Sequence, residues 1–169
     1  MNKQELKVEC EDTMNKTNVM RLLEQAGISY KAGEYEYDES DLSGVHAARA
    51  LGMDPDIMFK TLVARGDKKG ILVFCIPVAE ELDLKKAAKA AGDKKIELVH
   101  VKELFGLTGY IRGGCSPIGM KKKYPTYIEE TALLFDEISV SAGMRGCQVM
   151  LNPEELIKYV GAAACEIVK

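Results

Sequence analysis

The sequence predicts an α/β (α+β) fold, a single domain in which helices pack around a mixed or antiparallel sheet. Its 169 residues are a length typical of one domain. About seven strand-like and about five helix-like segments follow one another without a regular strand–helix alternation. Several strands are separated only by short, glycine-containing loops, which is typical of hairpins.

The residues between the elements fix where each element begins and ends. Asp83 and Asn152 are typical N-caps, while Gly27 and Gly92 are typical C-caps. The expected helices are 17–26, 45–51, 84–91, 102–107 and 153–160. The expected strands are 28–37, 58–65, 71–77, 96–99, 125–128, 138–141 and 147–151. Residues 1–14 are polar and charged, so we expect an N-terminal extension there and one domain over 15–169.

Composition narrows the classes of function. Lys and Arg together number 23 and Asp and Glu 26, for a net charge of −3, which argues against a DNA- or RNA-coating protein. Hydrophobic residues make up 47% of the chain, so it does not have the composition of a disordered protein. The polar start lacks the apolar core of a signal peptide, and no apolar run reaches the length of a membrane span. We therefore expect a cytoplasmic protein with neither DNA nor membrane as partner.

Cysteine and histidine are too dispersed for a zinc site. The five cysteines form no CxxC pair, and the chain has only two histidines. We therefore expect no metal and no cofactor, and reduced thiols. Cys115 is the cysteine best placed to react because it lies in a glycine-rich loop. Cys75, Cys147 and Cys165 have apolar neighbours, which is typical of packed thiols. Neither His46 nor His100 has the context of a catalytic base, so a Cys–His hydrolase has no support from the pattern.

Three further features are candidate parts of a site. On a strand, Lys60 shares a face with Met58 and Leu62, so its side chain either extends along this apolar face to solvent or serves a site. The segments GGCSPIG (113–119) and SAGMRG (141–146) are rich in glycine, which lets backbone N–H groups approach a ligand. Each segment is either an ordinary turn or one wall of a pocket. The first is not a P-loop, because no GK[ST] follows.

Four segments, taken in order, resemble the YbaK/EbsC family of Cys-tRNA(Pro) deacylases: FKTLV, PVAEELDLKKAAKAAGDKKIE, TGYIRGGCSPIGMKKKYPTYIEE and VSAGMRG. The resemblance runs from Asn15 to about Val160. It implies the fold of the editing domain of bacterial-type prolyl-tRNA synthetases, an α/β domain on a mixed, partly barrel-like sheet. It also implies hydrolysis of the ester that joins cysteine to tRNA(Pro). Prolyl-tRNA synthetase forms this ester by mistake, because cysteine and proline are similar in size and binding alone discriminates poorly between them.

The resemblance implies roles for individual residues. Lys60 falls on the lysine that the family requires, and the backbone of Gly113 and Gly114 is expected to stabilise the oxyanion. The expected substrate-binding residues are Tyr35, Ser116, Ser141, Gly143 and Arg145. Gln148 departs from the family, whose members carry Asp there. In the implied mechanism the substrate's own thiol attacks its carbonyl, and Lys60 binds the terminal phosphate or ribose.

Other functions remain open at this point. The chain could edit Ala-tRNA(Pro) or another aminoacyl-tRNA, could bind aminoacyl-tRNA without catalysis, or could be a hydrolase that depends on Cys115. The implied partners are the acceptor end of tRNA(Pro) and prolyl-tRNA synthetase. A net charge of −3 fits a domain that edits the aminoacyl end while the synthetase selects the tRNA.

Overall fold

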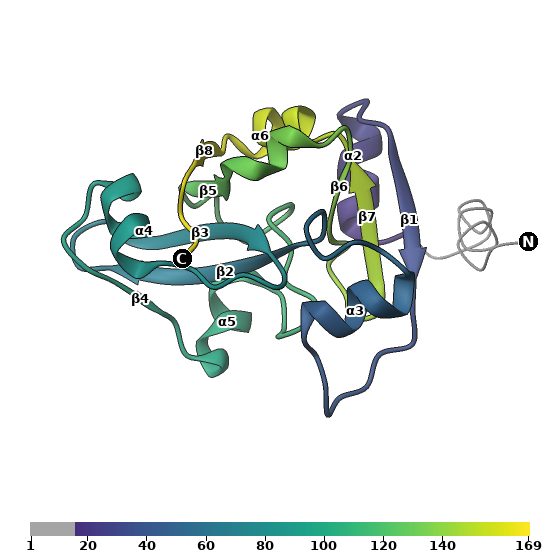
Figure 1. The fold of residues 1–169 in the computed structure, drawn as a ribbon, viewed down its shortest axis with the longest axis horizontal. Coiled ribbons are helices and arrows are strands. Elements are labelled where there is room, and N and C mark those ends of the chain that lie inside the picture. The colour runs from purple at the N-terminus through teal and green to yellow at the C-terminus, as the bar shows by residue number, and fades with distance from the viewer. Residues whose placement is uncertain (1–15) are drawn as a thin grey trace, which may run out of the picture.

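The computed structural model describes residues 16–169, so the expected extension over residues 1–14 lies outside the described residues. Figure 1 shows two groups of strands with helices around them. The helices are α2 (Asn18–Gln25), α3 (Gly44–Leu51), α4 (Leu84–Ala91), α5 (Val101–Thr108), α6 (Pro153–Val160) and the 3₁₀ helix η2 (Glu130–Leu134). The strands are β1 (Tyr30–Glu34), β2 (Phe59–Gly66), β3 (Gly70–Pro77), β4 (Ile96–Leu98), β5 (Thr126–Glu129), β6 (Ile138–Ser141), β7 (Cys147–Leu151) and β8 (Ala163–Cys165).

The strands form two sheets, which confirms the mixed α/β architecture. The larger sheet has the order β4-β2-β3-β5-β8, with β2 and β3 antiparallel and β3, β5 and β8 parallel. The smaller sheet, β1-β7-β6, is antiparallel. The sheets meet where Met58 bridges Ser139. Neither described sheet closes on itself, so the expected partly barrel-like sheet is open, since the two sheets share only this short bridge.

The cap residues predicted from the sequence act as caps. The Asp83 carboxylate accepts hydrogen bonds from the N–H groups of Lys85 and Lys86, both at 3.0 Å, at the start of α4. The side chain of Asn152 accepts the N–H of Glu155 at 3.0 Å at the start of α6. These bonds satisfy N–H groups that have no partner inside the helix.

Two elements were not expected, and one strand is shorter than expected. The strand β8 is only three residues of small, largely exposed side chains, so its conformation comes from pairing with β5 and not from a sequence pattern. The short helix η2 likewise follows β5 with no periodic signal. The strand predicted over 28–37 pairs only over Tyr30–Glu34. Beyond it, the Tyr35 N–H donates to the carbonyl of Gly146, and the chain leaves the sheet.

The hydrophobic core has three parts. The largest lies between the smaller sheet, β3, β5 and helices α2 and α6, and a second lies between the larger sheet and α4. The rings of Phe74 and Tyr127 stack at 5.3 Å between centroids in the second part. A third, smaller part fills the space under α3 and contains Met58. None of the helices in residues 16–169 combines the length and apolar character that crossing a membrane requires.

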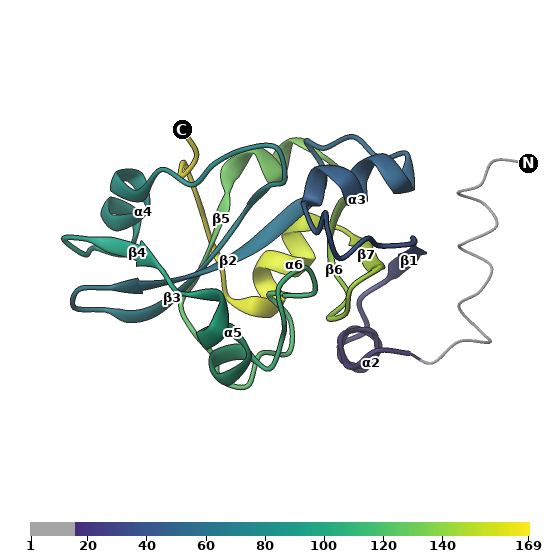
Figure 2. The same ribbon diagram turned by 90° about the horizontal axis from the view of Figure 1, so that it is seen from below.

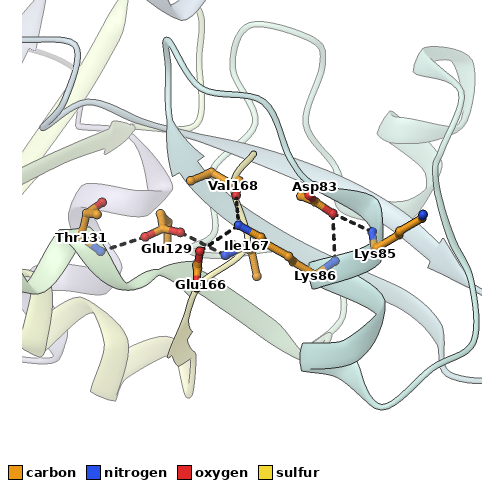
Figure 3. Close-up of polar contacts among 8 residues, drawn as sticks. All are labelled: Asp83, Lys85, Lys86, Glu129, Thr131, Glu166, Ile167 and Val168. Atoms are coloured by element: carbon orange, nitrogen blue, oxygen red, sulfur yellow. Dashed lines mark hydrogen bonds and ion pairs between the residues drawn. The ribbon is translucent and has the colours of Figure 1, made fainter.

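Polar contacts attach the C-terminal segment to the larger sheet. Glu129, which is 1% exposed, accepts the N–H of Thr131 at 3.1 Å and of Ile167 at 3.0 Å (Figure 3). Lys86 donates to Glu166 at 2.8 Å and to the carbonyl of Val168 at 2.9 Å. The end of the chain is therefore held on the side of the sheet that carries α4.

Candidate active site

A cavity of about 440 Å³ opens along β2. Its lining comes from β2, the start of α3, the β4–α5 junction, the glycine loop at 112–115, and the facing ends of β6 and β7. Figure 2 shows α3 and α5 on the two sides of β2. Segments that are far apart in the sequence therefore meet over one strand.

Lys60 lines this cavity and is half-buried on β2. Burial lowers the pKa of the Lys60 ammonium, and the nearby carboxylates of Glu81 and Glu80 oppose this shift without cancelling it. Partial removal from water strengthens electrostatic attraction to an anion. Lys60 either extends along an apolar face to solvent or serves a site, and its position in the cavity lining favours the second interpretation.

The structure brings together half of the expected site residues. Those that line the cavity are Tyr35, Lys60, Gly113 and Ser141. Those that do not line it are Gly114, Ser116, Gly143 and Arg145. The second group lies in the same two loops, which contact each other through Gly114 and Arg145.

The two glycine loops pack against each other. A Cβ atom at Gly114 would lie 3.1 Å from backbone atoms of Met144 and Arg145, so a larger residue would push the two loops apart by a few tenths of an ångström. Arg145 Nε donates to the carbonyl of Arg112 at 2.8 Å. The Gly114 N–H donates to the carbonyl of Ile111 at 2.9 Å. Gly114 is therefore not available as an oxyanion donor in this geometry, which reduces the expected pair of donors to the Gly113 position.

The serine hydroxyls of the loops shape the loops themselves. Ser141 Oγ accepts the N–H of Gly143 at 3.1 Å, and Ser116 Oγ accepts the N–H of Ile118 at 3.3 Å. Ser116 is fully buried and does not line the cavity. Ser141 both lines the cavity and fixes the second loop.

Gln148 pairs with Ser141 across β6 and β7, lines the cavity and is 6% exposed. Ser139 Oγ donates to Gln148 Oε1 at 2.8 Å, which fixes the carbonyl end of the amide. Burial raises the pKa of the Tyr35 hydroxyl, while hydrogen bonds with the Gly146 backbone and the Gln148 side chain lower it in part. The position where the family resemblance led us to expect Asp thus holds a neutral amide that Ser139 orients.

The thiols near the cavity are neutral. Cys115 lines it, but burial raises the pKa of the Cys115 thiol to about 12. Burial also raises the pKa of Cys75 to about 12. A thiolate is the nucleophilic form of cysteine, so neither group is activated for attack. The geometry does not favour the alternative of a Cys115-dependent hydrolase.

The charged side chains that line the cavity are cationic, although the chain as a whole is acidic. Lys60 and Arg112 line it, no Asp or Glu is among its described lining residues, and His100 lies at the edge near α5. In residues 16–169, no group of three or more His, Cys, Asp or Glu side chains is placed to hold a metal ion. The arrangement suits an anionic ligand, and the sequence pattern did not single out Arg112 or His100 for this site.

Comparison with known proteins identifies the family. A family model described as "Aminoacyl-tRNA editing domain" matches residues 42–159, which include β2, both glycine loops and the whole lining of the cavity except Tyr35. The chain belongs to the aminoacyl-tRNA editing domain family. The resemblance to the YbaK/EbsC group drawn from the four segments is confirmed.

Individual relatives agree with this editing-domain assignment. The chain is 50% identical over 155 residues to "Putative Cys-tRNA(Pro)/Cys-tRNA(Cys) deacylase EbsC" of Enterococcus faecalis (strain ATCC 700802 / V583), covering 92% of this chain and 94% of that protein. A solved structure titled "Crystal structure of a putative trans-editing enzyme for prolyl tRNA synthetase" superposes with a TM-score of 0.77 at 25% identity, over 100% of this chain and 99% of that one. Hypothetical protein APE2540 superposes with a TM-score of 0.80 at 20% identity, over 89% and 99%, which supports the fold alone.

Proposed function

We propose that this editing domain is a deacylase that hydrolyses Cys-tRNA(Pro) in trans. The observation that carries the proposal is the cavity along β2, which places Lys60 and Gly113 in a positive, carboxylate-free lining within the described residues. An aminoacyl-tRNA end is an anion with a reactive ester, so it matches this lining in charge. The 50% identical relative EbsC carries the name of a Cys-tRNA(Pro)/Cys-tRNA(Cys) deacylase, which supports the same class of substrate for this chain.

The substrate's thiol is the nucleophile in the proposed mechanism. Its sulfur forms a bond to its own carbonyl carbon, the bond from that carbon to the ribose oxygen breaks, and the thiol proton goes to the departing hydroxyl. Water then opens the resulting four-membered thiolactone to free cysteine. Burial raises the pKa of the Cys115 thiol to about 12, which fits a protein that supplies orientation and leaves the nucleophile to the substrate.

Three residues orient the ester. Lys60 attracts the terminal phosphate or the ribose hydroxyl, and the backbone at Gly113 faces the carbonyl oxygen as charge develops there. The amide of Gln148, held by Ser139, lines the cavity beside Ser141, where it can receive the amino acid. A neutral amide there cannot act as a base, so we assign it to binding.

Prolyl-tRNA synthetase is the proposed partner that selects the tRNA. A net charge of −3 gives the domain no general attraction for the long phosphate backbone of tRNA. The cationic groups of the cavity contact only the acceptor end. Selection of tRNA(Pro) is then left to the synthetase that mischarges it.

The test is a deacylation panel of Cys-, Ala-, Ser- and Pro-tRNA(Pro) with the wild-type protein and with Lys60→Ala. We expect hydrolysis of the cysteinyl ester only and a loss on the order of 100-fold or more in Lys60→Ala, the range for removing one preorganised electrostatic group. Lys31→Ala, which changes an exposed lysine on β1, is the matched control and should be neutral.

Each contrary outcome points to a specific alternative. A preference for alanine would make the protein an Ala-tRNA(Pro) editing enzyme. Hydrolysis of the seryl ester at the cysteinyl rate would remove the role of the substrate thiol. Binding of charged tRNA without release of amino acid would make it a non-catalytic module, and full activity of Lys60→Ala would refute the role of Lys60.

A further inference from the structure

Exposed apolar side chains gather on the rim of the cavity formed by β4 and α5. Leu98 is 50% exposed, Val101 60% and Phe105 58%. Leu98 and Val101 also line the cavity, together with Leu62 and Leu104. We call these four lining residues the apolar rim. An exposed apolar patch that continues into a cavity is typical of a binding surface.

The rim is firmly anchored, so its exposure does not come from a loose segment. The Glu103 carboxylate accepts the N–H of His100 at 3.2 Å and an Arg65 guanidinium N–H at 3.1 Å, which ties the start of α5 to β2. The Tyr124 hydroxyl donates to the carbonyl of Leu107 at 2.7 Å near the end of the helix. Both ends of α5 are thus held while the apolar side chains stay uncovered.

Positive charge lies beside the apolar rim. Lys121 Nζ is 4.8 Å from the centroid of the Phe105 ring, at the outer side of α5. Inside the cavity, the cations Lys60 and Arg112 are the nearest charged lining residues. Single-stranded nucleic acid is bound where bases stack on side chains and cations neutralise the phosphates. The aliphatic side chains of the apolar rim offer the face of one base apolar contact in place of aromatic stacking.

We call the end of the cavity beside Ser141 and Gln148 its polar end, and the end beside Leu98 and Val101 its apolar end. At the polar end, Met58 bridges Ser139, close to the Ser141 and Gln148 side chains that line the cavity. At the apolar end, Ala64 pairs with Leu98 of β4. The strand between these two bridges spans roughly 20 Å at about 3.3 Å per residue. Lys60 lies between Met58 and Ala64 on β2, so a ligand bound at Lys60 can extend toward either end of the one cavity.

We propose that the apolar rim binds the base of the 3′-terminal adenosine of tRNA, while the polar end holds the amino acid. The inference rests on the proposed function, since it takes the ester to lie beside Lys60. The ribose then lies over β2, and the base extends toward Val101 and Leu98. The flat apolar base covers side chains that are otherwise in water, and Lys60 and Arg112 balance the phosphate.

The test removes the apolar surface without adding charge. In Leu98→Ser/Val101→Ser both rim side chains become small and polar, and in the control Leu133→Ser/Leu134→Ser two exposed leucines of η2, 48% and 78% exposed, change in the same way. Each protein is assayed with Cys-tRNA(Pro) and with the same tRNA carrying an abasic 3′-terminal ribose. Binding of adenosine monophosphate is followed in parallel by NMR shifts, and far-UV circular dichroism checks folding.

We expect the rim variant to lower kcat/KM for the adenosine-ended substrate by about tenfold, the order for a lost apolar contact. It should leave the slower hydrolysis of the abasic substrate unchanged and weaken adenosine monophosphate binding by a similar factor, while the η2 control behaves as wild type. Equal losses on both substrates, or no loss, would overturn the inference. If wild-type protein released no cysteine, the proposed function would fail, and unaltered adenosine monophosphate binding in the rim variant would then refute the base site separately.

Discussion

Glu129→Gln should destabilise the protein by about 3 kcal/mol, because a buried carboxylate that serves two backbone groups cannot be replaced by an amide. Glu129 is the last residue of β5, and its two carboxylate oxygens accept the N–H groups of Thr131 and Ile167 (Figure 3). An amide offers one oxygen and one NH₂ group. In either orientation, one backbone N–H then faces a donor and stays unsatisfied.

The magnitude follows from the burial of this contact. A hydrogen bond to a charged group contributes about 1.5 to 3 kcal/mol net, and a buried N–H left without an acceptor costs about 1 to 3 kcal/mol. The new amide recovers part of this through its remaining oxygen, so we expect about 3 kcal/mol in total. In a domain of this size, that corresponds to a fall in Tm of roughly 6 to 12 °C.

The assay is urea unfolding followed by far-UV circular dichroism, since the chain contains no tryptophan to serve as a fluorescent probe. Glu130→Gln is the matched control, because Glu130 is the next residue and is exposed. The amide of Ile167 should also exchange its hydrogen faster in Glu129→Gln. An unfolding midpoint equal to that of Glu130→Gln would refute the reasoning.

Two further predictions use the pKa values of the structure. Cys115→Ser should keep deacylase activity within about twofold, because burial raises the pKa of the Cys115 thiol to about 12. For the same reason, iodoacetamide should label this thiol slowly in the wild-type protein at neutral pH. Loss of activity in Cys115→Ser would instead show that Cys115 is the nucleophile. Burial alone would raise the pKa of Asp93, but the backbone N–H groups of Lys68, Lys69 and Lys94 outweigh this and lower it. The stability from that carboxylate is present above the unfolded pKa and is lost as the pH falls below about 4, so urea midpoints of Asp93→Asn should decline less than those of wild type between pH 6 and pH 2.

Local sequence signals located much of the site. Lys60 stood out because an ionised side chain on an apolar strand face needs a reason to be there, and the structure places it in the cavity. Gly113 and Ser141 stood out because their loops are rich in glycine. The positions of Arg112 and His100 in the lining carried no such signal, since each depends on which strand or helix packs beside β2.

The glycine loops show where local reasoning stops. From the sequence alone, Gly114 and Arg145 could contact either the substrate or the other glycine loop. Both kinds of contact use a glycine that allows close approach and an arginine that donates hydrogen bonds. The structure decides for contact between the loops, with Arg145 bonded to the carbonyl of Arg112. In the same way, the bond from Ser139 to Gln148 joins two strands of the smaller sheet, and only strand register brings these side chains together.

By itself, the sequence determined the mixed α/β class, most helix and strand positions, the caps at Asp83 and Asn152, and the family through four ordered segments. These features depend on periodicity and on contacts within a few residues, which the order of amino acids specifies directly. Only the tertiary structure decided that the sheets stay open, that burial raises the pKa of the partly buried Cys115 thiol to about 12, and that Gln148 and Leu98 line the same cavity. Those properties depend on burial and on contacts between distant segments, and both exist only once the two sheets have packed around β2.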